Sequence, residues 1–194
     1  MIVTPKRFSI KEYHRLADLG FFASGDRLEL IRGEILKMSP KGTAHTSCCL
    51  RLIKKLAVLV GDIADLQCQD PIIIPINNSE PEPDFAILFK RDDDYISSHP
   101  LPGDILLVIE ISDSTLKYDR TIKLPLYAEA GIKDYWIFNL VENHLEAYSN
   151  PYQSTQGNFG YQTKQIVLPN QSVNLPGLDN LSLDLGKVFP PVLN

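Results

Sequence analysis

The sequence predicts a mixed α/β (α+β) fold in which a central β-sheet is flanked by helices. Three features indicate it: an amphipathic helical segment at 43–60, a series of short strand-like segments between 65 and 149, and one segment, DILLVIEI at 104–111, that is apolar almost throughout. A strand of the last kind is expected in the centre of a sheet that is covered on both faces. Strands combined with covering helices form a layered α/β or α+β domain.

Composition is typical of a globular protein. The 194 residues are 44% hydrophobic and 22% charged, which excludes a disordered or fibrous protein. We expect a single domain over 1–194, with a core at about 27–149 and C-terminal strands and a tail at 150–194. The formal net charge of −5 is not that of a protein that coats nucleic acid through a basic surface. This net charge is compatible with an enzyme that binds a metal cation, which then neutralises the negative charge of a phosphate.

The cysteines and the apolar segments predict a cytoplasmic protein. Cys48, Cys49 and Cys68 are odd in number and lack a CxxC spacing, which argues against a disulfide framework or a zinc knuckle. The first residues lack the apolar run of a signal peptide. The longest apolar segments are far shorter than the roughly 20 residues that cross a bilayer. We therefore expect no membrane partner.

The first third of the chain predicts a helix, a hairpin and a longer helix. An S-x-x-E capping box at 9–12 starts a helix that ends at Gly20. Strand-like residues on both sides of the turn dipeptide Arg32-Gly33 predict a β-hairpin. The longer helix spans Thr43–Val60 and ends at Gly61. Its expected buried face consists of Leu50, Ile53, Leu56, Ala57 and Val60.

Strands and polar loops dominate the rest of the chain. Loops are expected at 90–103 and 150–160, and a short helix at 121–130 is stopped by a glycine. Pro125 is compatible with that helix if the helix begins near Thr121, where the missing N–H costs at most one bond. The alternating or apolar segments predict strands at 65–69, 71–76, 84–89, 104–111, 133–140, 144–149 and 161–168.

One set of residues could carry chemistry. Asp84 begins one predicted strand, Glu110 ends another, and Lys123 follows thirteen residues later in the next helix. Adjacent strands can bring two such carboxylates within a few ångströms, where they repel unless a cation intervenes. Mg²⁺ or Mn²⁺ prefers oxygen ligands, activates water and neutralises charge on phosphate. A nearby ammonium adds positive charge for an attacking water or a phosphate.

Simpler interpretations of the same residues remain open. An acidic residue at a strand end is usually a surface or turn residue, and a lysine on a short helix usually points to water. Glu110 interrupts a strand that should be buried, so its carboxylate needs a partner. A structural salt bridge to Lys123 or Arg120 would also meet that need. Asp119 and Arg120 are expected to form a local ion pair.

Several motifs resemble a known family. They are ELIRGEILKMSP, followed by His45, then PEPDFAI, and then the block LVIEISDSTLKYDRTIKLPLYAEAGIKDYWIFN. Together they resemble the Uma-type family of endonucleases, part of the PD-(D/E)XK nuclease superfamily, over roughly residues 10 to 150. The resemblance implies a restriction-endonuclease-like core, which is a mixed sheet of four or more strands flanked by helices. It also implies a metal-dependent phosphodiesterase centre.

The resemblance also assigns roles to individual residues. Asp84 matches the aspartate of the P-D element and Glu110 the acidic residue of the (D/E)-x-K element, so both would be metal ligands. Ser112 stands where the superfamily has lysine. Lys123, in the following helix, is the candidate replacement.

Two further residues are carried over in supporting roles. Glu34 matches the glutamate of a G-E element in the hairpin and would complete the metal shell, with Glu29 as a rival for that role. His45 matches a histidine that precedes the long helix. It would contact a phosphate or a ligand carboxylate, or else hydrogen bond to the loop at the start of the helix.

These features predict a Mg²⁺- or Mn²⁺-dependent endonuclease that hydrolyses DNA. Asp84 and Glu110 would hold the metal with Glu34 in support, and Lys123 would assist the attacking water. The alternative is a non-catalytic binding or structural module on the same fold, which the net charge of −5 and the missing strand lysine favour. By analogy with the superfamily, the C-terminal strands could form a homodimer interface.

Overall fold

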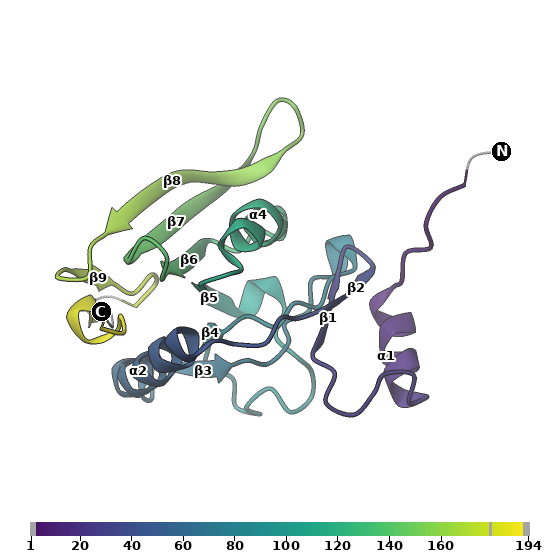
Figure 1. Ribbon diagram of the computed structural model, residues 1–194, viewed down its shortest axis with the longest axis horizontal. Helices are drawn as coiled ribbons and strands as arrows, with labels where there is room; N and C mark the ends of the chain where they lie inside the picture. The colour runs from purple at the N-terminus through teal and green to yellow at the C-terminus, as the bar shows by residue number, and fades with distance from the viewer. Residues whose placement is uncertain (1–2, 179, 192–194) are drawn as a thin grey trace.

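A six-stranded mixed sheet with helices on both faces forms the centre of the protein (Figure 1). The computed structural model describes residues 3–178 and 180–191. The sheet order is β3-β4-β5-β6-β7-β8, with β5 and β6 parallel and every other neighbouring pair antiparallel. The strands are β3 (Ala64–Cys68), β4 (Phe85–Phe89), β5 (Ile105–Ser112), β6 (Asp134–Asn139), β7 (His144–Gln153) and β8 (Phe159–Val167). This arrangement confirms the predicted fold class.

Separate apolar clusters cover the two faces of the sheet. The long helix α2 (Thr43–Val60) packs on one face together with the C-terminal segment, which contains β9 (Ser172–Asn174), β10 (Ser182–Asp184) and η4 (Leu185–Lys187). Helix α4 (Leu124–Glu129) packs on the other face. Side chains of β5 alternate between these two clusters, because successive residues of a strand point to opposite faces. The sequence predicted such a central strand, covered on both sides.

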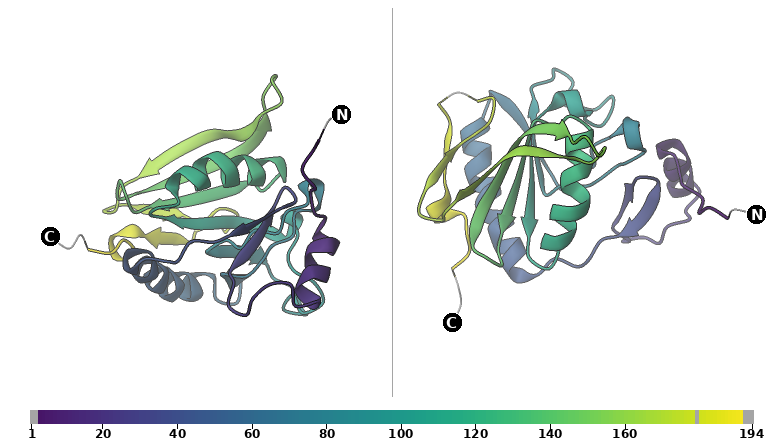
Figure 2. Two further views of the ribbon diagram at one scale, coloured as in Figure 1. Left: turned by 45° about the vertical axis from the view of Figure 1, so that its right-hand side comes forward. Right: turned by 90° about the horizontal axis from the view of Figure 1, so that it is seen from above.

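The N-terminal elements lie at one end of the sheet (Figure 2). Helix α1 (Ile10–Asp18) begins at the predicted capping box, and the hairpin of β1 (Leu28–Ile31) and β2 (Glu34–Lys37) turns at Arg32 and Gly33. Both turn residues have positive φ, 50° for Arg32 and 77° for Gly33. A two-residue hairpin turn whose twist matches that of the flanking strands requires positive φ at both positions. The turn therefore fixes the register of the hairpin.

The predicted buried face of α2 is confirmed at Leu56 and Val60, and Ile53 packs against the same core, but the rest of the face differs. The structure buries Cys48, Leu52, Leu56 and Val60, which are spaced four residues apart, whereas Leu50 is 55% exposed. Residues that are two positions apart lie on nearly opposite sides of a helix, so Leu50 and Leu52 cannot both face the sheet. The apolar pattern allowed either side, and contact with the sheet selected the Leu52 side.

The segment PIIIPI at 71–76 is not a strand, contrary to the prediction. Ile72 and Ile74 are fully buried, but their amides donate to the carbonyls of Pro81 and Ser79, which lie in loops. The segment ends in the short 3₁₀ helix η1 (Pro75–Asn77). Because the prolines of this segment lack an N–H, it cannot form a continuous ladder and contributes only its side chains to the core.

The predicted helix at 121–130 starts earlier than expected and contains an irregular turn. Helical backbone runs from α3 (Leu116–Tyr118) through a π-helical turn, η3 (Asp119–Lys123), into α4. The Leu124 amide donates to the Asp119 carbonyl five residues before it. Pro125, which has no N–H, lies in the first turn of α4 as a result. The widened turn directs Asp119 and Lys123 toward the protein interior, where both are buried.

The C-terminal half otherwise follows the predicted order. Strand β7 extends to Gln153, so the predicted loop at 150–160 is reduced to 154–158, and the β7–β8 hairpin projects beyond the rest of the sheet (Figure 1). The predicted loop at 90–103 is present and runs into the 3₁₀ helix η2 (Pro102–Asp104). No helix in the described part of the chain is long and apolar enough to cross a membrane.

We predict that Gly33→Ala destabilises the protein by more than about 1 kcal/mol, because an alanine is strained at φ 77°. In addition, its Cβ would lie 2.9 Å from the carbonyl oxygen of Phe8. The free energy of unfolding in urea measures the effect. Gly103→Ala is the control, since a Cβ added at Gly103 would meet no atom within 4 Å and the residue has no positive φ. Equal stability of the two variants would contradict the prediction.

Candidate active site

A cavity of about 420 Å³ lies where β5 ends and where β4 and α2 begin. The open end of the β1–β2 hairpin and the segment from β5 to the π-helical turn complete its walls. Asp84, Glu110 and Lys123, to which the sequence assigned catalytic roles, all line this cavity, and so does His45. Glu34 does not. The structure therefore brings together four of the five predicted site residues.

The pairing of β4 with β5 places the two carboxylates side by side. Phe85 of β4 is opposite Ile109 of β5, so that Asp84, one residue before the strand, comes opposite Glu110. Glu110 lies between Ile109 and Ile111, which belong to the cluster under α2, so its side chain points to the opposite face and contacts Tyr127 of α4. Asp84 and Glu110 are only 6% and 4% exposed. Two acidic groups therefore lie buried at neighbouring strand ends, as the sequence predicted.

Asp84 is held by three donors. Its Oδ2 lies 2.9 Å from His45 Nε2 and accepts a hydrogen bond of 2.9 Å from the Ile111 amide. Its Oδ1 lies 3.1 Å from Lys41 Nζ. Burial would raise the pKa of Asp84, but the hydrogen bond and charge of His45, together with Lys41, outweigh burial and lower that pKa. Asp84 is therefore an ionised carboxylate in the site.

Glu110 belongs to a second buried group, centred on Lys123. Glu110 Oε1 accepts hydrogen bonds from Lys123 Nζ at 2.8 Å and from the Tyr127 hydroxyl at 2.9 Å. The same ammonium lies 3.4 Å from Glu29 Oε2, and Glu29 Oε1 accepts a hydrogen bond of 3.0 Å from the Tyr118 hydroxyl. The predicted salt bridge between Glu110 and Lys123 is thus present, and it lies inside the cavity rather than apart from it.

The charges of this group shift the pKa values of its members. Burial raises the pKa of Glu110 to about 8, and the favourable charge of Lys123 does not cancel this effect. Burial would lower the pKa of Lys123, but the carboxylates of Glu110, Glu29 and Asp119 outweigh it and raise that pKa well above its ordinary value. The raised pKa of Glu110 reflects its burial, and the raised pKa of Lys123 reflects the acidic groups around it, so both groups hold their protons more strongly than they would in water.

Asp119 also faces the cavity, contrary to its predicted pairing with Arg120. Its Oδ2 accepts hydrogen bonds of 2.7 Å from the hydroxyls of Ser112 and Thr115. Arg120 points the other way and pairs with Glu146 on β7. Consecutive residues of a helical turn diverge by roughly 100°, so Asp119 and Arg120 reach different faces. Burial raises the pKa of Asp119, which adds another acidic group to the site.

The hairpin contributes Glu29 to the cavity, and not Glu34. Glu34 lies next to the hairpin turn, is exposed and pairs with Arg7. Glu29 lies on the same face of the hairpin but near its open end, where it is 4% exposed. The sequence prediction favoured Glu34 over Glu29. In the structure Glu34 lies at the turn of the hairpin, away from the other acidic residues of the cavity.

The donor set fits a divalent cation. Among the described residues, Glu29 Oε2 is buried without a hydrogen-bond partner. The buried acidic side chains of the cavity outnumber the basic side chains that contact them, and an uncompensated buried charge costs free energy. Hard oxygen donors of this kind are the ligands that Mg²⁺ and Mn²⁺ prefer. The buried acids that line the cavity are Glu29, Asp84, Glu110 and Asp119, whereas the basic groups that contact them are Lys41, His45 and Lys123.

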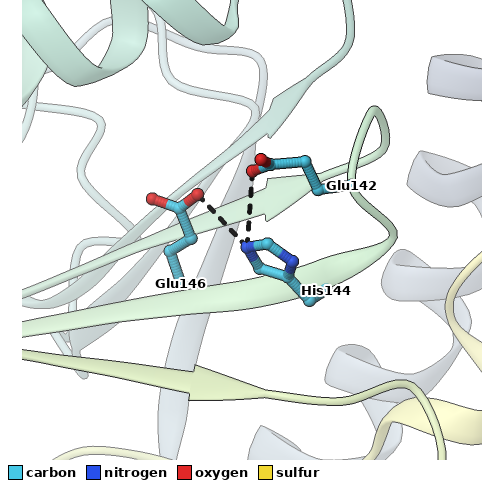
Figure 3. Close-up of side chains that lie close together, drawn as sticks. All are labelled: Glu142, His144 and Glu146. Atoms are coloured by element: carbon cyan, nitrogen blue, oxygen red, sulfur yellow. Dashed lines mark hydrogen bonds and ion pairs between the residues drawn. The ribbon is translucent and has the colours of Figure 1, made fainter.

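A second group of ligand-type side chains fits a cation less well (Figure 3). Glu142, His144 and Glu146 have ligand atoms within 4.8 Å of one another. However, Glu146 already pairs with Arg120 and lies 3.0 Å from Lys164 Nζ. Burial opposes ionisation of Glu146, but its hydrogen bonds, above all from Arg120, hold its pKa far below the ordinary value. The negative charge of this group is already compensated, which makes it a structural ion-pair network.

Sequence reasoning missed two residues of the cavity. Lys41 follows a proline in the segment between β2 and α2, and nothing in its sequence neighbourhood indicates that it reaches Asp84. Asp119 had a usable signal, since it lies four residues before Lys123 and helical spacing places such a pair on one face. The predicted ion pair of Asp119 with its neighbour Arg120 obscured this spacing.

Comparisons with known proteins bear on this fold and sequence. A model of the Uma2 family, described as "Putative restriction endonuclease", matches residues 10–186. The crystal structure of a "putative nuclease belonging to DUF820" from Anabaena variabilis is similar, with a TM-score of 0.71 and 15% sequence identity. The similarity covers 94% of this chain and 97% of that chain, and at this identity it concerns the fold. A search of curated proteins gave no match.

We predict that Glu110→Gln stabilises the metal-free protein progressively as the pH rises from about 4.5 to about 8. In this range the folded wild type holds a proton on Glu110 that the unfolded chain releases, so wild-type stability falls with rising pH. The variant lacks this loss, which is at most about 1.4 kcal/mol per pH unit for one proton. Urea unfolding with a chelator present, at several pH values, measures the difference.

Glu34→Gln is the matched control, because Glu34 is exposed and lies outside the cavity. Its stability should follow that of the wild type at every pH. A Glu110→Gln profile that runs parallel to the wild-type profile would contradict the assignment of the raised pKa to Glu110.

Proposed function

The chain belongs to the Uma2 restriction endonuclease family, and from this premise we propose that it hydrolyses DNA phosphodiester bonds with Mg²⁺ or Mn²⁺ as cofactor. The observation that carries the proposal is the convergence of Asp84, Glu110 and Glu29 in one cavity, where Lys123 pairs with Glu110 and Glu29. These acids come from separate parts of the chain, and their burial without enough positive charge has no structural benefit.

We assign the metal ligands to Asp84, Glu110 and Glu29, with Glu29 in place of Glu34. Asp84 is ionised, and the buried Glu29 Oε2 lacks a hydrogen-bond partner among the described residues. A divalent ion in such a site lowers the pKa of bound water and neutralises charge on phosphate. Glu110 would release its proton when a cation binds, since cation binding favours the ionised carboxylate.

The other residues of the cavity hold these groups in position. His45 Nε2 and the Ile111 amide fix the orientation of Asp84, and the hydroxyls of Tyr127 and Tyr118 fix those of Glu110 and Glu29. Side chains that are held in place in this way lose little entropy when a ligand binds. We therefore assign His45 to holding the proposed ligand carboxylate of Asp84, which is one of the contacts predicted for it.

Lys123 supplies fixed positive charge beside the acids. It is 5% exposed and remains protonated because three carboxylates raise its pKa. An ammonium that is preorganised in a water-poor site stabilises negative charge that develops on a phosphate. Its raised pKa makes it unsuited to removing a proton from water near neutral pH. We therefore assign Lys123 to charge stabilisation and orientation.

We predict that Asp84→Ala abolishes divalent-dependent cleavage of DNA. The variant loses a ligand carboxylate and leaves His45 and Lys41 without their acceptor. Cleavage of plasmid DNA in Mn²⁺, followed on gels, measures the loss, and calorimetry measures Mn²⁺ binding. Asp92→Ala, which changes an exposed aspartate outside the cavity, should cleave like the wild type.

Cleavage that survives in a clean preparation of Asp84→Ala would reject this assignment. A wild-type protein that binds no Mn²⁺ would instead favour the alternative of a non-catalytic module on the same fold.

We predict that Glu29→Gln weakens Mn²⁺ binding by roughly tenfold or more, because it removes a charged ligand from the cavity. Glu34→Gln, in the same hairpin, should bind Mn²⁺ like the wild type, since Glu34 is exposed and pairs with Arg7. Titration calorimetry of both variants decides between the two glutamates. The reverse pattern would restore Glu34 as the third acidic residue.

A further inference from the structure

The cations that line the cavity differ in how firmly they are held. In the described part of the chain, three lysines line it: Lys37, Lys41 and Lys123. Lys123 is 5% exposed and lies between two carboxylates. Lys37 is 72% exposed and pairs with Asp26, outside the cavity. Lys41 is intermediate, since its side chain is 20% exposed and its ammonium contacts Asp84 alone. Lys41 is therefore the cation that can exchange its partner.

The two oxygens of Asp84 are not equivalent. Oδ2 lies 2.9 Å from both His45 Nε2 and the Ile111 amide nitrogen. Among the described residues, Oδ1 contacts only Lys41 Nζ, at 3.1 Å. Oδ1 is thus the oxygen available to a metal ion. A divalent cation on Oδ1 and the Lys41 ammonium would compete for one acceptor and would repel each other.

The position of Lys41 in the chain limits where its ammonium can go. Lys41 lies two residues before Thr43, where α2 begins, so its backbone is anchored at the edge of the cavity. The four-carbon stem of lysine is flexible and its ammonium can rotate toward solvent. The other cavity lysine near the acids, Lys123, is enclosed between Glu110 and Glu29 and has no comparable freedom.

We propose that Lys41 is a phosphate-binding residue that neutralises Asp84 in the metal-free protein and pairs with a phosphate of the DNA once a divalent cation occupies Asp84. This inference rests on the proposed function and identifies a substrate contact of the same site. Lys41 would reach the phosphate from the segment before α2, in addition to Lys123, which stays between the carboxylates and supplies fixed positive charge there.

The test uses the variant Lys41→Met, which keeps an apolar stem and removes the charge, and the matched control Lys37→Met. Mn²⁺ binding is measured by calorimetry without DNA. Lys41→Met should bind Mn²⁺ about two- to fivefold more tightly than the wild type, the range expected when a partly exposed ion pair no longer competes. Lys37→Met should bind Mn²⁺ like the wild type, because Lys37 pairs with Asp26.

DNA binding is measured separately, with a labelled duplex in Ca²⁺ over a range of salt concentrations. Lys41→Met should bind the duplex more weakly, and the slope of log affinity against log salt should fall by about one, as the loss of one phosphate contact requires. Lys41→Arg keeps the charge and should retain the wild-type slope. Circular dichroism and thermal unfolding confirm that each variant is folded.

The outcomes separate this inference from the proposed function. Weaker Mn²⁺ binding by Lys41→Met would show that Lys41 supports the metal site rather than competing with it, and would overturn the inference. An unchanged salt slope together with normal Mn²⁺ binding would overturn it as well, while leaving the nuclease assignment intact. Failure of the wild type to bind Mn²⁺ would overturn both.

Discussion

The ammonium of Lys123, enclosed between Glu110 and Glu29, is the interaction on which the candidate site depends. It links the π-helical turn to β5 and to the hairpin, three elements that are far apart in the sequence. One positive charge does not neutralise the carboxylates around it, and burial raises the pKa of Glu110 to about 8. Such an arrangement is less stable than an apolar core of the same volume. Its presence in the interior is one reason for proposing a cation-dependent function.

Comparison with the second acidic group shows why buried carboxylates alone do not define a site. The side chain of Glu146 is fully buried, and that of Glu110 is nearly so. Arg120 and Lys164 compensate the negative charge of Glu146. The pKa shifts of the two glutamates are accordingly opposite in direction. A compensated network stabilises the β7 end of the sheet, whereas an undercompensated one attracts a proton or a metal ion.

An irregular helix positions the basic side of the site. Pro125 cannot donate to the preceding turn, and the backbone widens into a π-helical turn directly before it. Asp119 and Lys123 lie at the two ends of that turn and are both buried toward the cavity. Irregular helical turns of this type occur frequently at functional sites. Here the irregularity lets a helix-borne lysine, Lys123, reach Glu110 near the end of β5.

Local pattern determined much of this protein. The helix at Thr43–Val60, the hairpin at Arg32-Gly33, the central strand and the family motifs were all predicted from residue types and short spacings, as was the pairing of Asp84 with Glu110. Each depends on information carried by a few neighbouring residues: helical or strand periodicity, a turn dipeptide, or a motif. The prediction of a strand at 71–76 was wrong because two prolines prevent ladder formation there.

Only the tertiary structure decided which side chains complete the cavity. Glu29 and Glu34 share a face of the hairpin, and their distance from Asp84 depends on how the whole hairpin docks against the sheet. The same holds for Lys41, which acquires its partner through the position of α2, and for the side of α2 that is buried. These choices are set by contacts between residues that are far apart in the chain, and no local periodicity encodes them.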